Sequence, residues 1–346
     1  MTLSAVLCGA DNWVDVAEWA SDNESWLKKY LALENGTPSH DTFGRVFRLL
    51  DATVFEQCFR RWMADIVGVV KGVIALDGKT LCGSRDGKNT ALHMVSAFAT
   101  ESGLCLGQEG TRGKGNEISG IKALLETLTL KDCIVTIDAI GCQTEIAEKI
   151  VQRGGDYLLA VKENQGNLFK AVQEFYGEGQ ARGFGRLAVS RFETLDKDHG
   201  RIETRRYVWI DQLDWMEPSM QSNWKNLAGV GMVERQREIK GKRSVERTFY
   251  IGSKGISSAQ ALAEAARGHW GIENRLHWVL DVTFREDECR VRTGHAPRNL
   301  STIRKFALTL LRQDPQYPKR SLRSRRKTAD RLTDYRESLL DLQARG

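Results

Sequence analysis

Two aspartates each follow a short apolar run, and both are candidates for metal chemistry. Asp77 follows VIAL in VIALDGKT (73–80), and Asp138 follows IVTI in IVTIDAIGC (134–142). Both runs favour strands, so each carboxylate is expected at the C-terminal end of a strand, where open α/β sheets bind ligands. Two carboxylates brought together repel each other, and a divalent cation is the commonest reason for such a pair. We therefore expect a third carboxylate to complete a cation site.

Two simpler interpretations of VIALDGKT were weighed. The letters GKT end a phosphate-binding P-loop, but that loop needs another glycine five residues before its Gly-Lys pair, and Val73 stands there. A P-loop is excluded. The remaining alternative is an ordinary turn after a strand, with Asp77 and Gly78 as turn residues and Lys79 in solvent.

The best candidate for the third carboxylate is Glu273, in the stretch SSAQALAEAARGHWGIENRLHWVLDV (257–282). Alanine and leucine favour a helix in this stretch, and apolar residues recur at helical spacing. Ser257 or Ser258 is a suitable N-cap for it.

Two histidines accompany Glu273 on that helix. They belong to one polar strip, whose members follow one another at steps of four: His269, Glu273, His277 and Asp281. A plain surface face with ion pairs is the alternative, but Trp270 and Trp278 flank the strip and argue against full exposure. The two histidines are about 12 Å apart along the axis, so one ion cannot easily bind both. We expect them to contact phosphate groups or to form hydrogen bonds.

Composition restricts the classes of protein to which the chain can belong. Its 346 residues are 41% hydrophobic and 28% charged, which is typical of a globular protein with a sizeable core. Seven scattered cysteines contain no CxxC pair, so neither a disulfide framework nor a zinc site is indicated. No apolar stretch reaches the roughly 18 residues that span a bilayer, and the start lacks signal-peptide features. We expect a cytoplasmic protein with no membrane partner.

The charge of the chain points to a polyanion as one candidate partner. The formal net charge is +6, and the segment KRSLRSRRKTADR (319–331) has seven Lys or Arg against one Asp. Such a segment favours nucleic acid, although a basic end of a chain is often only solvated.

The elements that must position the candidate site follow from hydrophobic periodicity. Residues 1 to about 70 read as helical, with Asp41 as a possible N-cap. From residue 71 the order is strand, strand, strand, helix, strand, helix, strand, with ESG (101–103) as a hairpin turn. A helix that crosses over between strands implies parallel pairing, which predicts an α/β fold with a mixed sheet covered by helices.

A long segment separates the second and third carboxylates. Between Asp138 and Glu273 lie 134 residues, far more than one crossover helix needs, so we expect an insertion there. The stretches RRYVWIDQL, NLAGVGMVERQREI and RSVERTFYIGS favour strands, and IKGKRS between the last two predicts a hairpin.

Several long motifs resemble the H-repeat-associated branch of bacterial insertion-sequence DDE transposases. They are VIALDGKT, TIDAIGCQTEIAEKIVQRGGDYLLAVKENQGNL, DHGRIETRR and HWGIENRLHWVLDVTFREDECRVR, in that order over almost the whole chain. The resemblance implies a ribonuclease-H-like catalytic core with a β-rich insertion. It also implies that Asp77, Asp138 and Glu273 form the acidic triad.

The resemblance further implies a cofactor and roles for the triad. Two divalent cations, Mg²⁺ or Mn²⁺, would be held with Asp77 between them, Asp138 on one and Glu273 on the other. The motif departs from the family at two positions, where His269 replaces an arginine and Leu280 replaces a lysine. These departures concern phosphate contacts more than the triad. Rival candidates for the third acid are Asp281, Glu286 and Asp287.

The function implied by the resemblance is DNA transposition by phosphodiester cleavage and strand transfer at element ends. The partners would be double-stranded DNA, as element ends and target, and further copies of the chain in a homo-oligomer assembled on that DNA. The implied location is the bacterial cytoplasm, on the nucleoid when DNA is bound. Alternatives are a catalytically silent DNA-binding remnant and a nuclease without strand transfer. Relatives of this family commonly carry a further segment before the stretch that resembles SAVLCGADNW, so the resemblance implies that a start at Met1 would impair folding of the helical module or recognition of the element ends.

Candidate DNA contacts and domain limits complete the prediction. Phosphate contacts are expected from the two histidines of the helix and from the rim of the insertion, at Lys162, His199, Arg201, Arg205 and Arg206, although each is individually as well explained as a surface charge. Residues 1–70 are expected to form an N-terminal helical module, 71–312 a catalytic domain with the insertion at about 165–255, and 313–346 a basic C-terminal tail.

Overall fold

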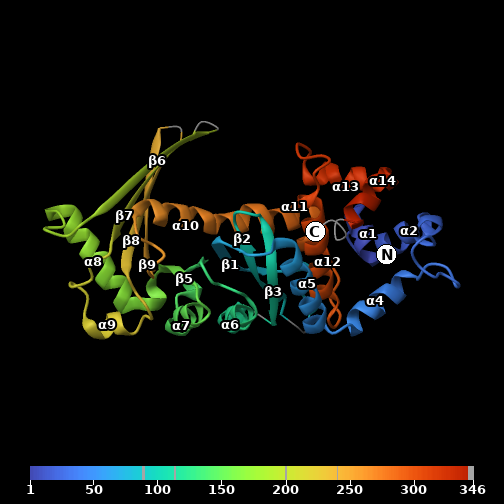
Figure 1. The fold of residues 1–346 in the computed structure, drawn as a ribbon, viewed down its shortest axis with the longest axis horizontal. Coiled ribbons are helices and arrows are strands. Elements are labelled where there is room, and N and C mark those ends of the chain that lie inside the picture. Colours follow the sequence, from blue (N-terminus) through green and yellow to red (C-terminus); the bar gives the residue numbers. More distant parts are fainter. Residues whose placement is uncertain (88–89, 113, 199–200, 240, 342–346) are drawn as a thin grey trace.

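The computed structural model describes residues 1–87, 90–112, 114–198, 201–239 and 241–341. Within these ranges the strands form one nine-stranded mixed sheet with helices on both faces (Figure 1). The order across the sheet is β3-β2-β1-β4-β5-β9-β8-β7-β6. The strands are β1 (Gly72–Thr80), β2 (Leu92–Ala99), β3 (Leu104–Arg112), β4 (Cys133–Ile137), β5 (Asp156–Val161), β6 (Ser190–Asp198), β7 (Arg201–Ile210), β8 (Gly229–Ile239) and β9 (Lys242–Gly252).

The first five strands have the order and directions predicted from the sequence. β1, β2 and β3 form an antiparallel meander, while β4 pairs parallel to β1 and β5 pairs parallel to β4. The two crossovers are α6 (Glu117–Thr127) and α7 (Thr144–Gln152), which pack on one face of the sheet. This is the ribonuclease-H-like arrangement that the family resemblance implies.

The segment between β5 and the Glu273 helix extends the same sheet. β9 pairs antiparallel to β5, and β8, β7 and β6 follow as long antiparallel neighbours. The three predicted strands are confirmed as β7, β8 and β9, with the expected hairpin between β8 and β9. The sequence analysis missed β6 and the helix α8 (Gly166–Arg182), and a short helix α9 (Pro218–Ser222) lies after β7.

The opposite face of the sheet is covered by the helix that carries Glu273. α10 (Ala259–Ile272) crosses the face formed by β1, β4 and β7, and it continues through a π-helical turn (Glu273–His277) into α11 (Trp278–Phe284). Ser258 is its N-cap, because the Ser258 hydroxyl accepts a hydrogen bond from the Ala261 amide at 3.1 Å. Further along the chain lies α12 (Ala296–Gln313), which packs against α5 and β3.

The two ends of the chain share one core (Figure 1). Its N-terminal helices are α1 (Thr2–Leu7), α2 (Trp13–Asp22), α3 (Glu24–Leu27), α4 (His40–Leu49) and α5 (Ala52–Val67), and its C-terminal helices are α13 (Leu322–Arg331) and α14 (Thr333–Leu340). Arg326 is 5% exposed and donates to the Val6 carbonyl at 2.9 Å. Residues 322–340 of the predicted basic tail are therefore folded helices.

Two local expectations need correction. The N-cap of α4 is Ser39, whose hydroxyl accepts from the Thr42 amide, and Asp41 lies in the first turn. Asp77 does not end its strand, because β1 continues to Thr80 through pairing with β2. None of the helices in the part of the chain described here has the length and apolar character needed to cross a bilayer.

Candidate active site

Strand register makes Asp77 and Asp138 neighbours. The parallel pairing of β1 with β4 ends at Leu76 opposite Ile137, and an aspartate follows each of these two residues in the chain. Ile74 and Leu76 lie in the core under α6 and α7, whereas Ala75 lies in the core on the other side. Because side chains alternate along a strand, Asp77 points to the side of Ala75, toward α10 and its continuation.

The loop that carries Asp138 is held by hydrogen bonds. The Asp138 carboxylate caps a short 3-10 turn (Ala139–Gly141) by accepting from the Ile140 amide at 3.1 Å. Asn164, after β5, donates to the Ala139 carbonyl at 2.6 Å, and Gln165 donates to the Cys142 carbonyl at 2.8 Å. The stretch KENQG after β5 therefore fixes the loop that holds the second carboxylate.

Close packing of a helix on β1 brings Glu273 to Asp77, whereas Asp138 lies outside the compact group of ligand atoms that these two acids form with His277. A Cβ atom on Gly268 would lie 3.1 Å from Val73, so glycine allows α10 to lie directly on the strand. Arg275 donates to the Thr100 carbonyl and lies 5.6 Å above the Phe98 ring, which fixes the turn after Glu273.

The π-helical turn aligns Glu273 with His277. Glu273 and His277 lie four residues apart in this turn, so both project from nearly the same side of the helix. His277 is 6% exposed, and its Nδ1 lies 3.3 Å from Asp77 Oδ2 and 3.9 Å from Glu273 Oε2. One ligand atom from each of Asp77, Glu273 and His277 lies within 4.8 Å of the others. The three side chains form a compact set of donors for a cation.

The electrostatics of the cluster show a need for positive charge. Burial opposes ionisation of Asp77, but His277 and His269 outweigh it and hold the Asp77 pKa below its usual range. Burial, together with the charge of Asp77, raises the pKa of Asp138 and of Glu273. The two acids beside Asp77 thus carry an unfavourable charge that a divalent cation would relieve.

A buried contact between His93 and Glu117 explains the glycine that follows Asp77. His93 Nε2 lies 3.1 Å from Glu117 Oε2, and a Cβ atom on Gly78 would collide with both side chains. Glu117 also contributes to the raised pKa of Asp138. Gly78 is therefore a packing requirement of the site and not only a turn residue.

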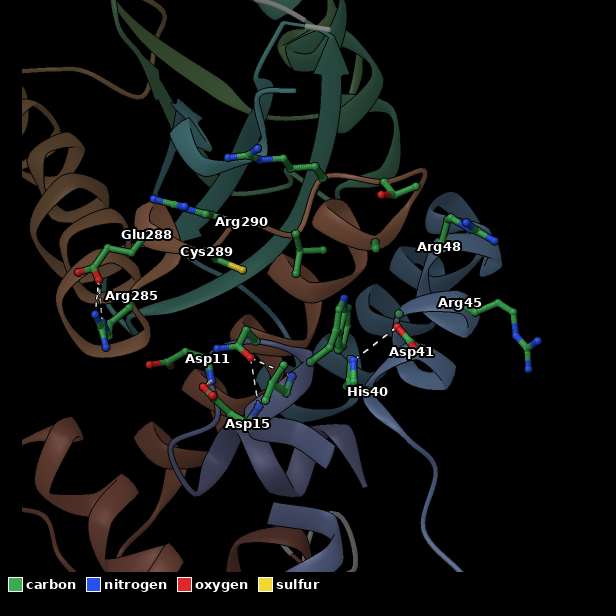
Figure 2. Close-up of a pocket in the computed structure, with 18 residues that line it drawn as sticks. Asp11, Asp15, His40, Asp41, Arg45, Arg48, Arg285, Glu288, Cys289 and Arg290 are labelled. Atoms are coloured by element: carbon green, nitrogen blue, oxygen red, sulfur yellow. Dashed lines mark hydrogen bonds and ion pairs between the residues drawn. The ribbon is translucent and has the colours of Figure 1, made fainter. Parts of the chain in front are cut away.

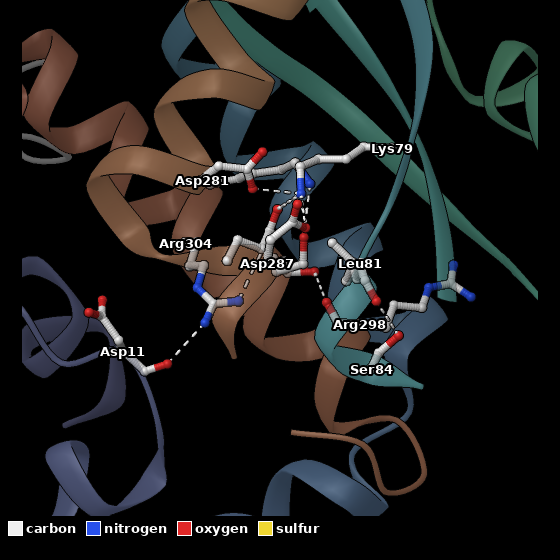
Figure 3. A network of polar contacts seen from close by, with 12 residues as sticks. Asp11, Lys79, Leu81, Ser84, Asp281, Asp287, Arg298 and Arg304 are labelled. Carbon is white, nitrogen blue, oxygen red and sulfur yellow. Dashed lines mark hydrogen bonds and ion pairs between the residues drawn. The ribbon is translucent and has the colours of Figure 1, made fainter. Parts of the chain in front are cut away.

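Lys79 points into a buried acidic network, which the sequence analysis did not foresee (Figure 3). Its ammonium lies 2.7 Å from Asp281, 2.6 Å from Asp287 and 3.7 Å from Glu286. Glu286 also lies 3.6 Å from Arg304. The three rival candidates for the third acid are thus all engaged with Lys79, two residues beyond Asp77 on β1.

His269 lies near the acids but has another partner. Its Nδ1 is 3.3 Å from the Thr136 hydroxyl on β4, and burial lowers the pKa of the imidazole. The charges of Asp77 and Asp138 act on it in the opposite direction. A neutral His269 is well placed to give a hydrogen bond beside the acids.

The predicted phosphate contacts of the insertion have different surroundings. Lys162 is exposed just after β5. Arg205 pairs with Asp196 at 3.0 Å and with Glu203, and Arg206 pairs with Glu193 at 2.7 Å. His199 and the side chain of Arg201 lie outside the part that the structure describes. Arg205 and Arg206 would have to exchange these partners to bind DNA.

A basic groove lies close to the turn that carries Glu273, and the sequence analysis did not predict it. It has a volume of about 690 Å³ and lies between one face of β7–β9 and the end of α10. Trp270, 56% exposed, lies at its edge. Five arginines line it, together with Glu246: Arg205, Arg235, Arg237, Arg267 and Arg275. The i, i+2 spacing of Arg235 and Arg237 on a strand was the available signal.

A second cavity is lined by none of Asp77, Asp138 and Glu273 (Figure 2). It measures about 740 Å³ and is bounded by α2, α4 and the segment 285–296. Arg45 and Arg48 come from α4, Arg290 from the facing segment, and Asp11 and Asp15 from the start of α2. None of the predicted site residues lines this cavity, so its size does not make it the site of chemistry.

Known proteins resemble the chain over nearly its full length. A family model described as "Transposase DDE domain" matches residues 42–310, and one described as "DDE_Tnp_1-associated" matches residues 1–63. The chain belongs to the DDE transposases. "Putative transposase YncI" of Escherichia coli O157:H7 is 40% identical, over 98% of this chain and 87% of that protein. "H repeat-associated putative transposase YhhI" of Escherichia coli strain K12 is 38% identical, over 98% and 90%.

These relatives confirm the H-repeat-associated branch that the motifs indicated. Among solved structures, a piggyBac transposase synaptic complex with hairpin DNA aligns with a TM-score of 0.45 and 10% sequence identity, over 100% of this chain and 71% of that one. Membership of the family supports a transposase function for the chain.

Proposed function

We propose that this transposase cleaves DNA at the ends of an insertion sequence and joins those ends to target DNA, using Asp77, Asp138 and Glu273 as its acidic triad. The observation that carries the proposal is that Asp77 has Asp138 beside it in the strand register and Glu273 beside it across the helix. β1 and β4 present Asp77 and Asp138 from adjacent register positions, and the turn after α10 brings Glu273 to Asp77.

The donor set fits hard divalent cations. Carboxylate oxygens are the preferred ligands of Mg²⁺ and Mn²⁺, and the raised pKa of Asp138 and Glu273 reflects carboxylate charge that lacks compensation. Two such cations, when bound, would supply the positive charge that a phosphodiester transition state needs at its attacking and leaving oxygens.

The side chains of the protein then have distinct tasks. Asp77 is ionised near neutral pH, since its pKa lies below the usual range of an aspartate. His269 is placed to donate to a phosphate oxygen, and Lys162 offers an exposed cation at the end of β5. In the reaction, the oxygen of water or of a DNA 3′-hydroxyl forms a bond to phosphorus while the existing P–O bond breaks. No covalent enzyme intermediate is needed.

The basic groove beside Glu273 is the proposed path of the DNA backbone. It combines five arginines with the exposed ring of Trp270, and it extends from the insertion strands to Asn274 and Arg275, the two residues that follow Glu273. Phosphate contacts from arginine supply affinity and position but not sequence selection. We further propose that copies of the chain assemble on paired element ends, on the DNA of the bacterial cytoplasm. We also propose that the predicted N-terminal module (1–70) and the predicted catalytic domain (71–312) act together in this reaction.

Cleavage of a labelled duplex that carries the element's own terminal sequence tests this function. Nicking at the element boundary should require Mg²⁺ or Mn²⁺ and should fall by about a thousandfold or more in Asp77→Ala, Asp138→Ala and Glu273→Ala, since each removes several kcal/mol of transition-state stabilisation. Glu145→Ala, which removes an exposed acid paired with Lys122, is the matched control and should cleave normally.

The same assay separates the alternatives. Boundary nicks together with joined products support transposition, whereas nicks without joining support a nuclease. Binding of the ends without any cleavage in either metal would support a silent remnant and refute the proposed catalysis.

A further inference from the structure

We propose that His277 is a nitrogen ligand of the cation held by Asp77 and Glu273, so that this cation site selects Mn²⁺ over Mg²⁺. The inference deepens the proposed function and rests on it, because it concerns the same site. It assigns to His277 a role different from the phosphate contact predicted from sequence.

The position of the imidazole is that of a ligand. Nδ1 faces both carboxylates, at 3.3 Å from Asp77 Oδ2 and 3.9 Å from Glu273 Oε2. Two donors that each lie about 2.1 Å from one ion at right angles are about 3 Å apart. The observed separations are thus close to those of donors that share an ion. Glu273 is 53% exposed on its side chain and is able to adjust.

A simple hydrogen bond explains the geometry less well. A charge-assisted N–H···O⁻ bond is about 2.7–2.9 Å long, shorter than the 3.3 Å between His277 and Asp77. One Nδ1–H also serves a single carboxylate, whereas a cation beside Nδ1 would serve Asp77 and Glu273 together.

Burial of His277 argues against a contact with DNA. The side chain is 7% exposed, and its Nε2 is buried with no hydrogen-bond partner among the described residues. Its remaining polar atom, Nδ1, is directed into the acidic cluster. A phosphate would have to displace the carboxylates to reach it.

The π-turn gives this role a local cause. The turn spans Glu273–His277, and these two side chains, four residues apart on one face, both reach Asp77. π-turns are rare and occur frequently at functional sites. His269, one helical turn before Glu273, contacts the Thr136 hydroxyl instead, at 3.3 Å.

Metal choice follows from the donor atoms. Mg²⁺ strongly prefers oxygen ligands, while Mn²⁺ binds imidazole nitrogen more readily and lies on the Irving–Williams series. A site with two carboxylates and one imidazole should bind Mn²⁺ about tenfold or more tightly than Mg²⁺. Replacing the imidazole by an oxygen donor should lower the ratio of Mn²⁺ affinity to Mg²⁺ affinity.

The test uses Mn²⁺ alone, without DNA. Electron spin echo envelope modulation of bound Mn²⁺ detects a directly coordinated ¹⁴N nucleus, and ¹⁵N-histidine labelling identifies it as histidine. His277→Asn retains a small polar side chain but offers oxygen as its donor, and His269→Asn is the matched control on the same helix. Circular dichroism and thermal unfolding verify that both variants fold.

The expected result is a histidine nitrogen coupling that His269→Asn keeps and His277→Asn loses, with Mn²⁺ still bound. Titration with Mg²⁺ in competition should show a smaller preference for Mn²⁺ in His277→Asn. Bound Mn²⁺ that depends on Asp77 but lacks nitrogen coupling would overturn this inference and leave the proposed triad intact. Failure of the folded protein to bind Mn²⁺ at all would overturn both.

Discussion

Replacing Lys79 by methionine tests how the active-site strand is fastened to the helix beyond Glu273. Lys79 is 10% exposed on its side chain and lies within 3.7 Å of three acids, of which Glu286 is almost fully buried. Methionine keeps much of the length of the side chain but removes the charge. The three acids would then lie close together without the ammonium group of Lys79 between them.

The size of the effect follows from burial. Breaking a buried ion pair by removal of one partner costs about 3–5 kcal/mol. Arg304 still lies 3.6 Å from Glu286, and Asp281 and Asp287 are 33% and 41% exposed, so water screens part of the loss. We expect Lys79→Met to lower the free energy of unfolding by about 2–3 kcal/mol at neutral pH.

The effect should depend on pH with a definite sign. Burial lowers the pKa of Lys79, but the three acids outweigh it and raise that pKa, so the contribution of Lys79 to stability is complete below its unfolded value of 10.5. In the variant, the unpaired acids acquire raised pKa values, and their repulsion is present only when they are ionised. The destabilisation should therefore shrink as pH falls from about 7 toward 4.

Urea unfolding at several pH values measures both quantities. Lys122→Met is the matched control, because Lys122 pairs with the exposed Glu145 and should change stability by about 1 kcal/mol or less. Equal losses in the two variants, or a Lys79→Met loss that does not vary between about pH 7 and pH 4, would refute the assignment of a buried charge network.

Three further predictions concern the cation, the helix and a close contact. Mn²⁺ or Mg²⁺ at one hundred times its dissociation constant should stabilise the folded protein by about 2.7 kcal/mol and so raise its melting temperature. This stabilisation should fade as acid protonates Asp138 and Glu273, whose pKa values are raised. Calorimetry with and without a chelator measures it. Ser258→Ala should cost about 1 kcal/mol in urea unfolding through loss of the α10 cap, and an unchanged midpoint would contradict that role. Gly83→Ala should destabilise by about 1–3 kcal/mol because its Cβ would collide with the Cys289 carbonyl, and a neutral result in thermal unfolding would show that this loop moves freely.

Local patterns in the sequence were sufficient to predict the strands and helices of the catalytic core. Each of the first five strands is a short apolar run, and the crossover helices have clear spacing, so order and direction followed from connection rules. β6 was missed because SRFETLDKD is polar and exposed along much of its length, and α8 was missed because glycines interrupt its pattern. The family assignment was also available from the motifs, and the family model and relatives confirm it.

The sequence by itself determined the family, the core topology and three candidate acids, because apolar periodicity and motif order are local properties of a chain. Tertiary structure alone decided which side chains meet. The register of β1 against β4 makes Asp77 and Asp138 neighbours, and the packing of α10 on β1 places His277 beside Asp77. It also decided that Lys79 is buried among acids from a segment some 200 residues later, since long-range contacts depend on how elements pack and not on sequence distance.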